Sequence, residues 1–142
     1  MKLLHSTFLL IFSMTVFAQS NAFAGDYNRN FSKEGDHLIE YKLNLRQDGT
    51  FVFHSYSKIK NGFPSQIITY GKGKWNVKDN VITFAANKQE DFDKKYTVDF
   101  SNSVARFVTK NLRDKSGKII LTRLTFLKSE IFWIQKLDVF KL

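Results

Sequence analysis

The sequence contains no cysteine and only one proline among its 142 residues. Without cysteine the chain has no disulfides, no thiol nucleophile and no thiolate ligands for metals. It also cannot be a lipoprotein of the kind that carries its lipid on a cysteine. Stability must therefore come from apolar burial, which contributes about 25 cal/mol per Å² of apolar area.

The chain also lacks the common signatures of catalysis. It has no Gly-x-Ser-x-Gly elbow, no phosphate-binding loop and no dinucleotide fingerprint. His37 and His54 are too few for a metal site of three or four ligands, and Glu90, Asp91 and Asp93 lack the spacing of a calcium loop. We therefore expect a non-enzymatic protein without metal or cofactor. The alternative, a weak hydrolase, requires a pair of buried carboxyl groups with raised pKa values.

One apolar run is present, and it lies at the N-terminus. Lys2 precedes the run Phe8–Phe17, which is followed by the small-x-small triplet Ala22-Phe23-Ala24. This order is typical of a secretory signal peptide, and the run is shorter than the roughly 20 residues of a membrane-spanning helix. We predict a signal peptide over residues 1–24, export to the periplasm or the extracellular space, and no transmembrane helix in the mature chain. A retained N-terminal membrane anchor is the alternative.

After this segment the sequence changes to a strand-like rhythm. Residues 25–37 are polar and mixed, which predicts a flexible or loosely docked arm. From Leu38 onward, apolar and polar side chains alternate in short runs, as they do in half-buried strands. Asp48-Gly49 separates two such runs and predicts an antiparallel hairpin of residues 38–47 and 50–59.

A second hairpin is expected directly afterwards. It joins Gln66–Val77 to Val81–Phe84 through a tight turn. Gly71 and Gly73 fall on the same face as Trp75, which we expect to point inward. Two glycines on an inward face indicate a sharp bend of the sheet, or a group that lies against the backbone.

The remaining sequence predicts further strands and no convincing amphipathic helix. Residues 87–95 fit a short helix or a long loop, and the expected strands are Tyr96–Phe100, Val104–Asn111, Lys118–Lys128 and Ile131–Ile134. About eight short strands joined by turns indicate an all-β antiparallel meander that forms a single domain over residues 38–142. Such a meander favours a closed barrel over a sandwich.

Two stretches of this meander carry a family resemblance. They are Leu-Asn-Leu-Arg-Gln-Asp-Gly-Thr-Phe from Leu43 to Phe51, and Gly71-Lys72-Gly73-Lys74-Trp75 followed by Asn80–Phe84. Together they resemble the L-x-L-x-x-D-G-T-F … G-x-W … I-x-F rhythm of small bacterial lipocalin-like secreted proteins, over residues 38–86. The resemblance implies an up-and-down barrel with an apolar cup for a small ligand, and it implies no catalytic residue.

The excess of aromatic residues suggests a ligand site in the barrel interior. We expect a small amphipathic ligand to lie against apolar walls with one charged end. The candidate wall residues are Trp75, Phe84, Phe107 and Trp133, and the candidates for the charged end are Arg106 and Arg123. The alternative is that the aromatic side chains fill a solid core.

The formal net charge of +9 indicates an acidic partner. Outside the cytoplasm this partner would be an anionic lipid surface, an acidic polysaccharide or an acidic protein, and nucleic acid is not expected. A basic stripe along two expected strands suggests an inhibitor or interaction module that presses this face on its partner; it comprises Arg106, Lys110, Arg113, Lys115, Lys118 and Arg123. Alternatively, the basic side chains serve only solubility and the protection of sheet edges.

Overall fold

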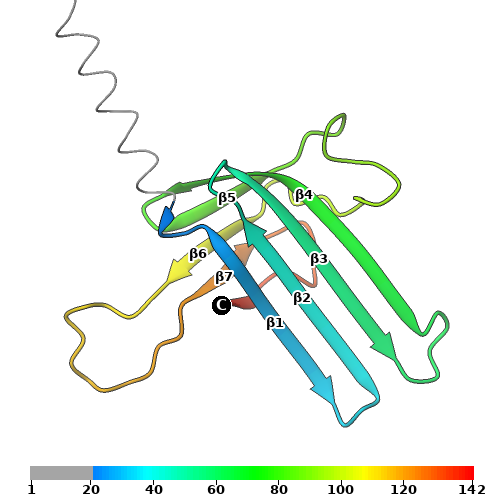
Figure 1. The fold of residues 1–142 in the computed structure, drawn as a ribbon, viewed down its shortest axis with the longest axis horizontal. Coiled ribbons are helices and arrows are strands. Elements are labelled where there is room, and N and C mark those ends of the chain that lie inside the picture. Colours follow the sequence, from blue (N-terminus) through cyan, green and yellow to red (C-terminus); the bar gives the residue numbers. More distant parts are fainter. Residues whose placement is uncertain (1–20) are drawn as a thin grey trace, which may run out of the picture.

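The computed structural model describes residues 21–142, which form a closed antiparallel barrel (Figure 1). Each strand pairs with the next in the chain, and β1 pairs with β8 to close the barrel. This confirms the predicted all-β meander and its closure. The eight strands are β1 Gly25–Lys33, β2 His37–Leu45, β3 Thr50–Ile59, β4 Gln66–Lys78, β5 Val81–Ala85, β6 Val104–Val108, β7 Arg123–Lys128 and β8 Asp138–Lys141.

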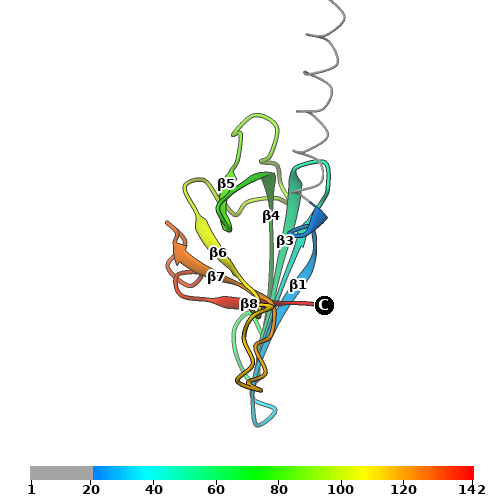
Figure 2. The same cartoon turned by 90° about the vertical axis from the view of Figure 1, so that its left-hand side faces the viewer.

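The two halves of the barrel differ in length. Strands β1–β4 have 9 to 13 residues, whereas β5–β8 have 4 to 6. Strand β8 pairs with β1 only at Tyr27 and Asn28, while the pairing of β1 with β2 continues to Lys33. The far ends of β1–β4 therefore form a sheet extension beyond the closed part. Figure 1 shows it as two long projecting hairpins, and Figure 2 shows the same sheet edge-on. The sheet extension comprises residues 30–33, 37–40, 56–59 and 66–69.

The prediction of a flexible arm over residues 25–37 is wrong, because strand β1 occupies most of this segment. This strand pairs with β2 along its whole length and closes the barrel against β8. Tyr27 points inward and is buried, while Asp26 and Asn30 face away from the interior. The segment looked like an arm because its outer side chains are polar and its inward row contains Arg29.

The two hairpins predicted from the turn residues are confirmed as β2–β3 and β4–β5. The four other expected strands are shorter or absent. Strand β6 ends at Val108, so residues 109–111 of the expected strand Val104–Asn111 lie outside it. Tyr96 makes only an isolated bridge to Tyr70, residues 118–122 lie outside β7, and Ile131–Ile134 form turns. Their apolar side chains had suggested strands, but several of them, such as Ile134, anchor connections to the core.

Closely spaced aromatic rings fill the centre of the barrel. Phe51 lies 5.0 Å from Phe84 between ring centroids, Phe53 lies 4.7 Å from Phe100, and Phe84 stacks on Phe126 at 5.6 Å. These five side chains are all buried. The interior of the barrel is therefore a packed core.

Strand β4 follows the inward face predicted for it. Gly71, Gly73 and Trp75 are buried, while Lys74 and Asn76 are exposed. A Cβ atom on Gly73 would lie 2.2 Å from the carbonyl oxygen of Ala85. The expectation that another group lies against the glycine backbone is confirmed.

Residues 21–24 pack on one end of the barrel. The Phe23 ring meets the Phe107 ring edge-on at 4.8 Å, and the Tyr27 hydroxyl donates to the carbonyl oxygen of Phe23 at 2.5 Å. The Lys141 ammonium donates to the carbonyl oxygen of Ala22 at 2.8 Å. Most of the predicted signal peptide lies outside the described residues, and the cleavage before Gly25 stays a prediction.

A polypeptide that starts at Gly25 is expected to be less stable than one that starts at Asn21, by about 1–3 kcal/mol. It loses the aromatic pair with Phe107, worth about 0.5–1.5 kcal/mol beyond burial, and two acceptors of side-chain hydrogen bonds, worth about 1 kcal/mol each. Urea unfolding of the two polypeptides measures the difference. The control is Phe63→Ala in the longer polypeptide, because Phe63 is fully exposed. Equal midpoints for the two starting points would contradict the expectation.

Candidate ligand-binding groove

The inner face of the sheet extension is apolar and open to solvent. The strand register places Phe31, Ile39, Ser57 and Ile67 in one row across β1–β4. This row lies on the same face as the core residues Tyr41 and Phe53, because side chains two positions apart along a strand share a face. Ile39 is partly buried against the core, whereas Phe31 and Ile67 are 41% and 47% exposed, and no second layer from residues 21–142 covers them.

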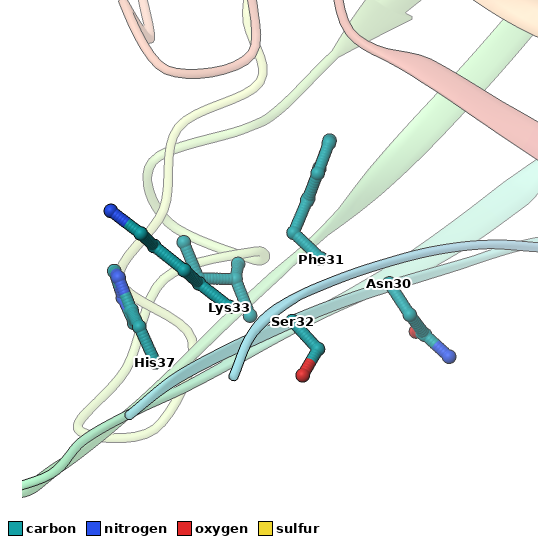
Figure 3. A pocket seen from close by; sticks show the side chains of 6 residues that line it. Asn30, Phe31, Ser32, Lys33 and His37 are labelled. Carbon is teal, nitrogen blue, oxygen red and sulfur yellow. The ribbon is translucent and has the colours of Figure 1, made fainter. Parts of the chain in front are cut away.

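A pocket of about 430 Å³ opens at the β1–β2 end of this face. It is lined by Asn30, Phe31, Ser32, Lys33, His37 and Ile39. Figure 3 shows the side chains of Phe31, Lys33 and His37 on one side of the hairpin and those of Asn30 and Ser32 on the other. The pocket thus combines an apolar wall with two basic side chains, those of Lys33 and His37, and none of its lining residues within 21–142 carries a carboxylate.

Trp133 marks the inner end of the open face. It comes from the connection between β7 and β8 and stacks on Tyr41 with 5.5 Å between ring centroids. Tyr41 in turn meets the Phe31 ring edge-on at 6.3 Å. Three neighbouring aromatic rings therefore connect the core to the open face. We call this face the mouth groove and define it by Phe31, Lys33, His37, Ile39, Tyr41, Ile67 and Trp133.

Arg29 lies beside the mouth groove and has an unusual environment. Its guanidinium carbon is 4.7 Å from the centroid of the Phe31 ring and 5.1 Å from that of the Phe140 ring. Its Nε is buried without a hydrogen-bond partner, and neither ion pair found among the described residues includes it. Cation–π contacts of this kind contribute about 0.5–2 kcal/mol, but they leave the positive charge unneutralised.

The six ligand-binding residues expected from the sequence do not surround one cavity. Trp75 and Phe84 are buried in the packed core, where the Trp75 indole donates to the carbonyl oxygen of Arg46 at 2.9 Å. Phe107 lies at the opposite end of the barrel, against Phe23. Of the aromatic candidates, only Trp133 reaches the mouth groove.

The two arginine candidates lie on the outer surface of the barrel. Arg106 is exposed on β6, and the Nε of Arg123 on β7 lies 3.7 Å from the Asp138 carboxylate. Asp138 also accepts a hydrogen bond from Thr125. Neither arginine points into the interior, because Ala105 is the buried residue beside Arg106 on β6, and Leu124 and Phe126 take the inward positions of β7.

Sequence reasoning missed the residues on β1 because it assigned them to a flexible arm. The available signal was a period of two along this segment. Outward-facing polar residues alternate there with an inward row formed by Tyr27, Arg29, Phe31 and Lys33. An arginine in the inward row made the alternation hard to recognise.

The outer face of β2–β4 carries a second cluster of rings and cations. His54 lies 4.9 Å from Tyr70, and the Lys95 ammonium lies 4.6 Å from the Tyr70 ring centroid. Burial and the charge of Lys42 lower the pKa of His54. The neutral imidazole is therefore favoured, and the positive charge of this face comes from its lysines.

The titratable groups offer little support for acid–base chemistry. Among the described residues, the carboxyl groups with shifted pKa values are Asp48, Asp93 and Asp114, and all three are lowered. The main causes are hydrogen bonds from Thr50 to Asp48, from the Tyr96 backbone to Asp93 and from Ser116 to Asp114. A general acid needs the opposite shift. No three His, Asp or Glu side chains gather as a metal site in residues 21–142.

In the same residues, no helix has the length and apolar character needed to cross a bilayer. Comparisons of the chain with protein-family models, curated proteins and solved structures find no significant match, so the mouth groove itself is the basis for proposing a function.

Proposed function

We propose that this protein is an exported, non-enzymatic binding protein that holds a small amphipathic anion in the mouth groove. In this proposal it is a small secreted lipocalin-like barrel whose ligand lies at the mouth of the barrel, because aromatic rings occupy the centre. The observation that carries the proposal is an apolar row, Phe31, Ile39 and Ile67, in which Phe31 and Ile67 are exposed. Beside it lie Lys33 and Arg29, which form no ion pair within residues 21–142.

The apolar row supplies the affinity for a hydrocarbon chain. Each CH₂ group buried against it contributes about 0.8 kcal/mol, and the volume of about 430 Å³ lies within the usual range of small-ligand sites. The row leads toward the stacked rings of Tyr41 and Trp133. An acyl chain lying along the groove covers side chains that are otherwise exposed to water.

The basic side chains select the sign of the head group. Lys33 and His37 are directly opposite each other in the β1–β2 register, and His37 Nε2 lies 3.4 Å from the Ser57 hydroxyl. Arg29 adds a further positive charge beside Phe31. A carboxylate or phosphate head group accepts charge-assisted hydrogen bonds from Lys33 and Arg29, whereas these two charges repel a cationic head group.

The test is binding of dodecanoate and of dodecyltrimethylammonium to the purified protein by calorimetry. Dodecanoate is expected to bind and the cation is not. Phe31→Ser and Lys33→Glu are each expected to weaken dodecanoate binding roughly tenfold. A brominated acyl chain is expected to quench Trp133, because this side chain borders the groove, and to leave the buried Trp75 unquenched.

Matched controls separate the groove from general effects of charge and exposure. Lys88→Glu repeats the charge change at an exposed lysine of the β5–β6 connection, and Leu112→Ser removes a fully exposed apolar side chain elsewhere. Both are expected to bind dodecanoate as the unchanged protein does. No binding of dodecanoate, or equal affinity in the groove variants and the controls, would rule out the mouth groove as the site.

A further inference from the structure

The connection between β6 and β7 is long, basic and apolar at the same time. It covers residues 109–122, which we call the basic loop, and it stands away from the barrel at the left of Figure 1. Loops of this length without secondary structure are uncommon in compact domains and are usually functional or disordered. Hydrogen bonds within the loop hold this one in a defined form.

Local hydrogen bonds fix the tip of the basic loop. The backbone N–H of Arg113 donates to the Asn111 side chain at 3.0 Å, and that of Ser116 donates to the Asp114 side chain at 2.8 Å. At the base, the Thr109 and Thr122 hydroxyls lie 3.0 Å apart. The loop is thus a preformed projection, and its side chains are displayed to solvent.

Apolar side chains of the basic loop have no partner in the barrel. Leu112 is fully exposed, Ile119 is 89% exposed, and Leu121 is 58% exposed. Single exposed apolar residues are ordinary on protein surfaces, but several on one projecting loop mark an interaction site.

Basic side chains surround these apolar residues. The loop contains Lys110, Arg113, Lys115 and Lys118 and only one acidic residue, Asp114. All four cations are exposed, and Asp114 is already engaged by Ser116. The projection therefore joins a local excess of positive charge to apolar side chains that can leave water.

We propose that the basic loop docks the protein on an anionic lipid bilayer, with Leu112 and Ile119 inserted among the lipids and Lys110, Arg113, Lys115 and Lys118 on the head groups. Lysine and arginine side chains near a bilayer interact with anionic head groups, and their long stems let the charge stay at the interface. Insertion of separate side chains needs no complementary surface on the partner.

A protein partner fits this loop less well. Cores of protein–protein interfaces are enriched in aromatic residues and depleted in lysine, whereas the basic loop has no aromatic residue and three lysines. Its apolar side chains also lie in two separate stretches, at Leu112 and at residues 119–121, with Arg113, Lys115 and Lys118 between them. Mixed apolar and basic side chains are typical of segments that lie at a membrane interface.

The proposal is independent of the mouth groove. In an antiparallel meander, the β6–β7 connection lies at the same end of the barrel as the β2–β3 and β4–β5 turns, and the Phe107 N–H donates to Asn80 of the β4–β5 turn at 2.8 Å. The mouth groove lies at the other end, with the β1–β2 turn. Substitutions in the basic loop are therefore expected to leave dodecanoate binding unchanged.

The experiment is sedimentation of the purified protein with vesicles of phosphatidylcholine alone and of equal parts phosphatidylcholine and phosphatidylglycerol. We expect binding only to the anionic vesicles, and weaker binding as salt rises, because salt screens exposed charges. Lys115→Glu combined with Lys118→Glu is expected to weaken binding roughly tenfold or more. The charge-matched control, Lys88→Glu with Lys94→Glu, changes exposed lysines of the β5–β6 connection and is expected to have a much smaller effect.

Insertion is measured directly, because the chain contains no cysteine. Leu112→Cys carrying an environment-sensitive dye is expected to shift its emission to the blue with anionic vesicles, while Lys88→Cys with the same dye is not. No binding to anionic vesicles, or equal losses in the two charge-reversed variants, would overturn the proposal. Equal binding to soluble polyglutamate without a dye shift would also overturn it, in favour of an acidic macromolecule. Circular dichroism confirms that each variant is folded.

Discussion

Replacing Phe100 with alanine is expected to lower the free energy of unfolding by about 3–5 kcal/mol, the usual range for a buried phenylalanine. Phe100 is fully buried, and its ring centroid lies between 4.7 and 6.3 Å from those of Phe51, Phe53, Phe84 and Phe126. Removing this ring also removes its contacts with the four neighbouring aromatic rings. A loss of this size is a large part of the 5–15 kcal/mol that stabilises ordinary domains.

Urea unfolding followed by tryptophan fluorescence measures this loss. The control is Phe132→Ala, which removes the same number of atoms from a side chain that is 83% exposed. It is expected to change stability by no more than about 0.5 kcal/mol. If Phe100→Ala were equally mild, the centre of the barrel would not be the packed core described above, and an interior ligand cavity would have to be reconsidered.

Gly73→Ala is expected to destabilise the protein by about 3 kcal/mol or more, because added volume in a packed site forces the backbone to move. The new Cβ would lie 2.2 Å from the Ala85 carbonyl oxygen and 3.0 Å from a ring carbon of Phe51. The ring can turn away, but the carbonyl belongs to the neighbouring strand β5. Relief of the clash therefore requires the β4–β5 pairing to shift.

Two variants on the same strand give a graded comparison for Gly73→Ala. Gly71→Ala places a Cβ 3.0 Å from the Val98 carbonyl oxygen and 3.1 Å from the Phe100 ring, so a smaller loss of about 1 kcal/mol is expected. Lys74→Ala, on the exposed face, is expected to be neutral within about 0.5 kcal/mol. Chemical denaturation ranks the three, and a Gly73→Ala midpoint equal to that of Lys74→Ala would contradict the close approach.

The parts of the fold that sequence predicts well are those with a local cause. Asp48-Gly49 forms the β2–β3 turn, with Gly49 at a φ of +86°, and the Asp48 carboxylate accepts hydrogen bonds from Thr50. Such turn chemistry depends on neighbouring residues only. The inward face of β4 was readable for the same reason, since a period of two is a property of a single strand.

The parts that sequence missed depend on distant partners. Strand β1 is polar enough to suggest an arm, and it is ordered because β2 and β8 lie on its two sides. Ile119 and Leu121 belong to an apolar run that suggested a central strand, but they lie exposed in the basic loop. Local pattern cannot distinguish an apolar run that pairs with a strand from one that meets solvent.

The candidate site was partly predictable. The aromatic excess was interpreted as a ligand-binding interior, with a solid core as the alternative, and the rings are found in the core. Of the expected site residues, Trp133 borders the mouth groove through its stacking on Tyr41. The assignment of Trp75 and Phe84 to a ligand cavity assumed a hollow barrel, whereas side-chain volume decides whether a barrel of eight strands is filled. The groove arises because β1–β4 are longer than β5–β8. Its presence follows from the folded structure, in which β1 continues beyond its pairing with β8.

Closure by β1 and β8 also determines how this chain must fold. Tyr27 pairs with Lys141 where β1 and β8 close the barrel, so two strands that are far apart in the sequence must meet. Such non-local pairing slows folding. Until β8 arrives, both β1 and β7 present unpaired backbone groups that can recruit another chain. The short last strand, supported by the hydrogen bond from the Leu142 N–H to the Asp26 carbonyl oxygen, is thus also a guard against self-association.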